Sequence, residues 1–272
     1  MTILVTGGTG YTGREIARLL AERDVPFRAA SRASGFDWTD PDTFESALDG
    51  VHAAYLLPPP GVGGRLPLLE SFLTAAKAKG VRRLVLLSTS VDDVPGQAEF
   101  HRAVLDAAPE YAILRPTWFM QNFVGAHPTA RRIREHGEIA TATGEGRIGF
   151  VHTADIAAVA VETLLADEAP NRDYLITGPE ALSYRDAAKL IDEVAGYPVR
   201  YVPLTPEQGR AQWEAAGMPA EVTEYAAELD KKLAAGLEDR VSTTVADLTG
   251  RPARSLREFA RENRDHWQEV TN

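Results

Sequence analysis

With 272 residues, the chain is long enough for one large α/β domain, or for one that carries a smaller appendage. It has no cysteine, which excludes disulfide bonds, thiolate catalysis and cysteine-ligated metals, and its net charge of −10 argues against a nucleic-acid partner. No apolar run approaches the roughly 20 residues of a membrane span, and the N-terminus does not resemble a signal peptide. We therefore expect a cytoplasmic protein that does not bind membranes, and the spacing of the histidines predicts no metal site.

The first half of the chain alternates between short apolar runs and longer amphipathic segments. The apolar runs predict strands, and the segments with one apolar face predict helices. The expected strands are residues 3–6, 26–31, 52–57, 81–88 and 111–114, and the expected helices are residues 12–23, 40–48, 66–79 and 99–107. Such alternation is typical of a doubly wound, Rossmann-type α/β fold, in which a parallel sheet binds ligands at the carboxyl ends of its strands.

The second half of the chain is less regular. Several glycines make residues 137–151 a predicted turn-rich loop or hairpin. The other expected elements are a helix over 156–165 capped by Asp155, a late strand over 174–178, a helix over 184–194 capped by Ser183, and an acidic, mostly helical remainder from Pro203 onward with a solvated face. We predict a Rossmann domain over residues 1–178, which includes a substrate-side loop over 117–150, and a small, mainly helical substrate-side domain over 179–272.

A glycine-rich turn lies between the first expected strand and the first expected helix. One glycine allows the tight turn, one lets the backbone approach a pyrophosphate, and the last lets helix and strand pack closely. The N-terminus of the helix adds N–H groups and a partial positive charge. The turn therefore predicts a dinucleotide site, with a glycine turn that holds no ligand as the alternative. Its residues are Gly7, Gly8, Thr9, Gly10, Tyr11, Thr12 and Gly13.

The end of the expected strand 26–31 indicates which dinucleotide binds. Sites that prefer NAD usually place Asp or Glu about 20 residues after the glycines, where it holds the ribose hydroxyls. This chain has no acid there, and Ser31 with Arg32 could hold a 2′-phosphate instead. We expect NADP(H), with NAD(H) less favoured, and a solvated surface arginine is the alternative interpretation of Arg32.

Motifs along nearly the whole chain resemble the NmrA-like branch of the atypical short-chain dehydrogenases. Residues 36–38 and 115–120 look most like the festuclavine-dehydrogenase subgroup of ergot alkaloid reductases, and type-2 quinone oxidoreductases are near relatives. The segments that carry the resemblance are Val5-Thr6-Gly7-Gly8-Thr9-Gly10, Ser31-Arg32, Leu114-Arg115-Pro116-Thr117-Trp118-Phe119-Met120-Gln121-Asn122-Phe123, residues 150–156 and residues 177–183.

The resemblance implies several further site residues. Asp37 and Trp38 are expected beside the adenine. Leu56, Leu57 and Pro58 are expected along the cofactor, Ser88 and Thr89 beside the nicotinamide ribose, and residues 116–119 around the nicotinamide and the substrate. The expected cofactor contacts therefore include Pro116, and the expected substrate pocket includes Trp118, Phe119 and Asn122.

One departure from the wider family bears on the reaction. Short-chain dehydrogenases that act on carbonyls or alcohols usually carry Tyr-x-x-x-Lys, and no tyrosine of this chain has a lysine four residues later. Isoflavone-reductase relatives place a lysine on the helix before the strand 111–114, where this chain has His101 and Arg102. His101 is therefore the candidate catalytic acid, and a slip of one residue in the alignment would exchange it for Arg102.

The missing tyrosine–lysine pair leaves two functions open. The first is an NADPH-dependent reductase that transfers hydride to a small quinone, enone or iminium acceptor, because an iminium carbon needs positioning more than an acid. The second is a regulatory protein that binds NADP(H) and senses its redox state without turnover. A small-molecule substrate is the expected partner, and a homo-oligomer is compatible with either function.

Overall fold

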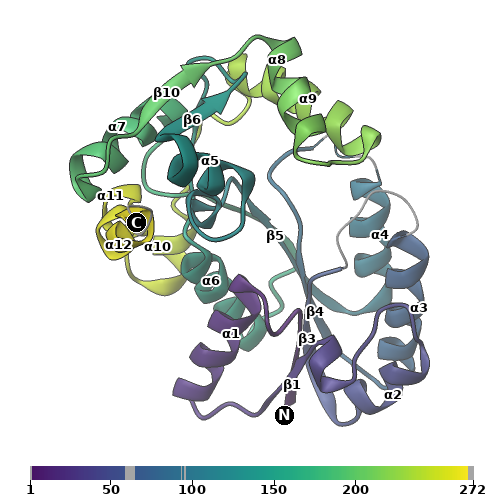
Figure 1. Cartoon of the computed structure of the whole chain (residues 1–272). Helices are drawn as coiled ribbons and strands as arrows, with labels where there is room; N and C mark the ends of the chain where they lie inside the picture. The colour runs from purple at the N-terminus through teal and green to yellow at the C-terminus, as the bar shows by residue number, and fades with distance from the viewer. Residues whose placement is uncertain (1, 59–64, 93, 95, 269–272) are drawn as a thin grey trace. The chain divides into compact units, whose positions relative to one another are not determined.

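A computed structural model describes residues 2–58, 65–92, 94 and 96–268 of the chain (Figure 1). Its contacts divide the chain into two interleaved units. The first unit comprises Met1–Pro116, Thr153–Ile176 and Thr244–Arg251, and the second comprises Thr117–His152, Thr177–Thr243 and Pro252–Asn272. The sequence predicted a single boundary after residue 178, whereas the chain passes between the units several times.

The elements of the first unit follow the predicted βα alternation. Local sequence explains their ends: Asp40, for example, accepts a hydrogen bond from the backbone N–H of Asp42 at 3.1 Å where the second helix begins. The elements are β1 (Thr2–Thr6), α1 (Tyr11–Glu22), β2 (Phe27–Ala30), η1 (Arg32–Ser34), α2 (Asp42–Leu48), β3 (Val51–Leu56), α3 (Arg65–Ala78), β4 (Arg83–Leu87), α4 (Gln97–Ala107), β5 (Glu110–Pro116), α6 (Thr153–Leu165), β8 (Arg172–Ile176) and α10 (Thr244–Thr249).

Six strands of the described chain form one parallel sheet in the order β2-β1-β3-β4-β5-β8. Helices α1 and α6 lie on one face of this sheet, and α2, α3 and α4 lie on the other (Figure 1). Strands covered on both faces are mostly apolar, as β3 is from Ala53 to Leu56, because both faces are withdrawn from water. The predicted doubly wound, Rossmann-type fold class is confirmed. The chain leaves β1 toward β2 and returns to its other side as β3, so the strand order reverses between β1 and β3.

The second unit is mainly helical and has its own apolar core, which includes Phe123, Phe150, Tyr184 and Trp267. Its two short sheets pair β6 with β10 and β7 with β9. Its elements are η2 (Met120–Phe123), α5 (Pro128–His136), β6 (Glu138–Thr141), β7 (Arg147–Ile148), β9 (Leu182–Ser183), α7 (Tyr184–Ala195), β10 (Arg200–Pro203), α8 (Pro206–Ala215), α9 (Ala220–Ala234), α11 (Leu256–Glu262) and α12 (Arg264–Gln268).

Two local predictions are corrected and one is confirmed. Asp155 is not the N-cap residue of a helix that begins at Ile156, because α6 begins at Thr153 and Asp155 lies fully buried in its first turn, where Arg251 pairs with it at 3.2 Å. Residues 137–151 contain strands, but these pair with distant segments rather than with each other as a hairpin would. Ser183 does cap its helix, through a capping box with Asp186. None of the helices in the described ranges is long and apolar enough to cross a bilayer.

Candidate functional site

The glycine turn between β1 and α1 packs too closely for side chains at three of its positions, Gly7, Gly8 and Gly13. Gly7 has a φ of +67°, and a Cβ atom on it would lie 2.7 Å from the side chain of Leu57. A Cβ on Gly13 would lie 2.2 Å from the carbonyl oxygen of Gly7, a distance that no side chain tolerates. The first turn of α1 is thereby held directly against the end of β1, as a dinucleotide-binding turn requires.

The N-terminus of α1 is open to an anion. Its N-cap residue is Gly10, and within this fully described helix no side chain caps the N-terminus and no acid occupies the first turn. Unsatisfied N–H groups and the positive end of the helix dipole therefore remain for a ligand. The turn itself is fixed from the other side, because the N–H of Gly8 donates to the carbonyl of Ala30 at 3.2 Å. This arrangement fits a pyrophosphate.

Thr6 joins the two strands on either side of the point where the strand order reverses. Its hydroxyl donates to the carbonyl of Tyr55 at 3.0 Å and accepts from the N–H of Leu57 at 2.8 Å. This buried bridge fixes the carboxyl end of β3 beside the carboxyl end of β1, which places Leu57 against Gly7. Ligands of open α/β sheets bind at this reversal point.

An exposed arginine side chain follows β2. Arg32 begins η1 and is exposed, and its guanidinium makes no hydrogen bond or ion pair within the part of the chain that the structure describes. Ser34 holds the segment in place, because its hydroxyl accepts from the N–H of Ser31 at 2.9 Å. Asp37 is occupied locally: the N–H and the hydroxyl of Thr39 both donate to it at 2.8 Å. These hydrogen bonds, with a contribution from the charge of Arg32, lower the pKa of the Asp37 carboxyl.

Two of the residues predicted to contact the cofactor have largely structural surroundings. Trp38 is half-buried and packs with its ring centroid 5.4 Å from that of Phe36 and 5.0 Å from that of Phe72, on the core of the first unit. The side chain of Leu56 is fully buried in the same core, so only its backbone could face a ligand. Of the two, Trp38 is the one that still exposes part of its side chain.

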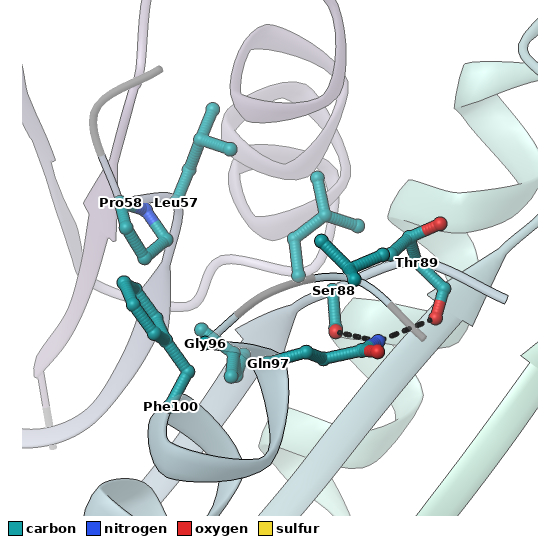
Figure 2. A pocket seen from close by; sticks show the side chains of 10 residues that line it. Leu57, Pro58, Ser88, Thr89, Gly96, Gln97 and Phe100 are labelled. Carbon is teal, nitrogen blue, oxygen red and sulfur yellow. Dashed lines mark hydrogen bonds between the residues drawn. The ribbon is translucent and has the colours of Figure 1, made fainter. Parts of the chain in front are cut away.

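A cavity of 450 Å³ lies at the carboxyl ends of β3 and β4, as expected for a sheet of this type (Figure 2). Its walls are mostly apolar, with a few polar groups from the end of β4 and the start of α4. The lining residues are Leu57, Pro58, Leu86, Leu87, Ser88, Thr89, Val94, Gly96, Gln97 and Phe100. Four of the residues predicted to contact the cofactor, namely Leu57, Pro58, Ser88 and Thr89, therefore line one cavity.

Ser88 links this cavity to His101. The hydroxyl of Ser88 lies 2.8 Å from Nε2 of His101. The side-chain amide of Gln97 donates to the same hydroxyl and to the carbonyl of Thr89, at 3.1 Å each (Figure 2). His101 itself is half-buried and is not among the residues that line the cavity. Any proton that it exchanges with a ligand in this cavity would pass through Ser88.

The surroundings of His101 favour its neutral form. Burial lowers the pKa of the imidazole, and the positive charge of Arg115 acts in the same direction, against the opposing charges of Asp173 and Asp92. Arg115 itself pairs with both of these carboxylates. The competing candidate, Arg102, is exposed on α4, so the neighbouring position on this helix points to solvent.

The predicted substrate residues are divided between the units. Pro116 is buried at the end of β5 in the first unit. Trp118 and Asn122 line a cavity of 230 Å³ in the second unit, which we call the α9 cavity because residues of α9 form one side of it. Phe119 is half-buried, forms a β-bridge to Val151, and is not among the lining residues of the α9 cavity.

Sequence reasoning missed three polar residues that the structure brings into these sites. Thr6 acts through a hydrogen bond to Tyr55, which is distant in the chain, and Gln97 acts through hydrogen bonds to Ser88 and Thr89 at the end of β4. The sequence carries no local signal for either. Asp230 had a signal. Val222, Ala226, Leu229 and Asp230 share the face of α9 that lines the α9 cavity, and a carboxylate on such a face is unusual. The prediction that the acidic C-terminal helices are only a solvated face is therefore wrong for Asp230.

Comparison with known proteins assigns the family. No family model matches the chain. The chain is 39% identical to the YesF oxidoreductase of Bacillus subtilis, over 97% of this chain and 96% of that protein. It is 37% identical to agroclavine dehydrogenase of Claviceps fusiformis, over 98% and 99% of the two chains. Its structure resembles the NADPH-dependent quinone oxidoreductase QOR2 of Escherichia coli, solved with NADPH, with a TM-score of 0.78 and 25% identity over 96% and 99% of the chains.

Both the clavine dehydrogenases and the type-2 quinone oxidoreductases are groups that the motifs resemble, and the likeness extends over nearly the full length of each chain. The chain therefore belongs to the NmrA-like branch of the atypical short-chain dehydrogenases/reductases.

Proposed function

We propose that the protein is an NADPH-dependent reductase that transfers hydride to a small quinone, enone or iminium acceptor. The observation that carries the proposal is the uncapped glycine turn between β1 and α1, followed at the end of β2 by an exposed arginine without a partner in the described chain. Agroclavine dehydrogenase and the NADPH complex of the quinone oxidoreductase support the same reaction type.

The residues at the β1, β2 and β3 ends fit NADP(H). The N–H groups at the start of α1 would bind the pyrophosphate, because Gly7 and Gly13 let the turn and the helix pack closely and no side chain caps the helix. Arg32 and Ser31 would bind the 2′-phosphate through charge-assisted hydrogen bonds. The nearest acid along the chain, Asp37, is already engaged by Thr39, so the selection of ribose hydroxyls typical of NAD sites is not supported.

The cavity at the ends of β3 and β4 would hold the reacting end of the complex. When bound, NADPH supplies the hydride. Leu57, Pro58 and Phe100 would exclude water there, and Ser88 and Thr89 would offer hydroxyl groups to the polar edge of a ligand. Ser88 would donate a proton to the developing oxyanion of a quinone or enone, with His101 behind it, whereas an iminium acceptor would need no such proton.

Stopped-flow measurement of NADPH oxidation tests this proposal directly. The enzyme, premixed with NADPH, is mixed with a quinone, an enone or a cyclic iminium, and absorbance of the reduced nicotinamide is followed. We expect oxidation that saturates with at least one acceptor and is faster with NADPH than with NADH. Calorimetric binding of NADPH without oxidation by any acceptor would contradict the reductase and favour the regulatory protein that only binds the cofactor.

A further inference from the structure

The α9 cavity in the second unit is lined by aromatic rings and a single acidic side chain. Trp118, Trp213, Tyr184 and Tyr225 supply the rings, and Asp230 is the one acid among the lining residues that the structure describes. Its volume of 230 Å³ is below the roughly 300–1,000 Å³ of pockets for drug-sized ligands, so it suits a molecule of about two fused rings. The cavity is built entirely from residues of the second unit.

Asp230 is half-buried and has no cationic partner. Within the described chain it forms no ion pair, and the basic side chains of the adjacent helix turns are taken: Lys231 pairs with Glu228, and Arg210 with Glu224. Burial raises the pKa of the Asp230 carboxyl to about 6, against hydrogen bonding from the Trp213 side chain and the Ala142 backbone. At neutral pH the carboxylate is therefore charged, and within the described chain it has hydrogen-bond donors but no counter-ion.

The other titratable groups that face the α9 cavity are neutral at the same pH. Burial lowers the pKa of His127 below its ordinary range, so its imidazole is uncharged. Burial, together with the charge of Asp230, raises the pKa of Tyr184, so its hydroxyl stays protonated. Tyr225 is the other tyrosine among the lining residues. The carboxylate of Asp230 is thus the charge that a ligand in this cavity meets.

We propose that the α9 cavity binds a flat, positively charged organic ligand, whose cationic nitrogen pairs with Asp230 and whose rings pack against Trp118 and Trp213. A partly desolvated carboxylate gains most from a cation that is itself weakly hydrated, as a substituted iminium is, and indole faces attract the same charge. Of the acceptor classes in the proposed function, the iminium is the one that carries such a charge. Binding in the α9 cavity does not require that the bound cation be the acceptor reduced at the ends of β3 and β4.

Binding without cofactor tests the inference separately from turnover. We would titrate the protein at pH 8 with N-methylisoquinolinium and with isoquinoline, which has nearly the same shape and is uncharged at this pH, and follow the heat by calorimetry. We expect the cation to bind about tenfold more tightly or better. Equal affinity for the two compounds, or no binding of the cation, would overturn the inference, whatever the result with NADPH.

Asp230→Asn removes the charge and keeps the shape. It should abolish the preference for N-methylisoquinolinium and leave isoquinoline unchanged, whereas Glu221→Gln, which removes an exposed acid from the same helix, should change neither. An unchanged preference in Asp230→Asn would overturn the inference. The wild-type protein gives a second measurement, which does not depend on how a substitution affects the fold. Because the pKa of Asp230 is raised to about 6, the carboxyl loses its charge on acidification, and binding of N-methylisoquinolinium should weaken from pH 8 to pH 5 with a midpoint near 6. Binding that does not change with pH would contradict the role of Asp230.

Discussion

The hydroxyl of Ser88 and Nε2 of His101 lie 2.8 Å apart, and the direction of that hydrogen bond depends on the charge and the tautomer of the imidazole. Gln97 already donates to the Ser88 oxygen. When His101 is neutral and carries its proton on Nδ1, the single proton of Ser88 points to the free Nε2. When His101 is protonated, Nε2 donates instead, and the Ser88 proton becomes available to the cavity that Ser88 lines.

This relationship predicts an acid-dependent reduction of quinones and enones. Because the pKa of His101 is lowered below its ordinary value of 6.5, the imidazole is neutral at pH 7 and becomes protonated only as the pH falls further. Turnover of a quinone should therefore rise on acidification through that lowered pKa and be flat above it. In His101→Gln the rise should disappear, with turnover at low pH reduced by roughly 10²–10⁴-fold.

An iminium acceptor is the internal control for this experiment, because it needs no proton, and its reduction by His101→Gln should match the wild type. Ser88→Ala should reproduce the loss seen with the quinone. If both variants keep the acidic rise, His101 is structural.

Arg32→Ala should lower affinity for NADPH and leave affinity for NADH nearly unchanged. A charge-assisted hydrogen bond to a phosphate contributes roughly 1.5–3 kcal/mol, which is about tenfold to a hundredfold in binding. Calorimetry with both nucleotides measures the difference. Arg102→Ala, which removes another exposed arginine of the first unit, is the matched control and should affect neither nucleotide. Equal loss for NADPH and NADH would mean that Arg32 does not contact the 2′-phosphate.

Gly13→Ala should separate α1 from the turn. The added Cβ would lie 2.2 Å from the carbonyl oxygen of Gly7, and backbone atoms on both sides leave little room to shift. Overpacking of this kind costs roughly 1–3 kcal/mol of folding free energy. We expect a lower melting temperature and a loss of NADPH binding, measured by thermal denaturation and calorimetry. Unaltered NADPH affinity would contradict the assignment of this turn to the pyrophosphate.

Trp118→Leu and Trp38→Leu should have different consequences. Trp118 lines the α9 cavity, so its loss should raise the KM for the acceptor and leave the Kd for NADPH unchanged. Trp38 packs against Phe36 and Phe72, so its loss should lower the melting temperature. Steady-state kinetics and thermal denaturation of the two variants separate these effects. If Trp118→Leu lowers only the melting temperature, Trp118 is a core residue.

The parts of the fold that were predictable from sequence are those that depend on local patterns. Strand and helix periodicity located the elements of the first unit, and the glycine spacing located the turn at Gly7, because each depends on residues a few positions apart. The capping serine at residue 183 belongs to the same class. Such local patterns can be recognised without knowledge of tertiary contacts.

Features that depend on pairing between distant segments could not be predicted from the sequence. The parallel pairing of β6 with β10 joins Glu138 to Arg200, and nothing in either short segment indicates its partner. The predicted cap Asp155 is instead paired with Arg251, which is almost a hundred residues away in the chain. Thr6 was missed for a related reason, since it bonds to Tyr55 and Leu57, which only folding brings near.

The interleaving of the two units has a consequence for how the protein is made. Helix α10 packs against α6, and Arg251 forms an ion pair with the buried carboxylate of Asp155. The first unit therefore includes residues from late in the chain. A nascent chain that has emerged only as far as residue 178 holds the whole parallel sheet but lacks this cover. The first unit can therefore reach its native packing only after residue 251 leaves the ribosome. By then most of the second unit has also been synthesised, so the two units complete their folding together rather than one after the other.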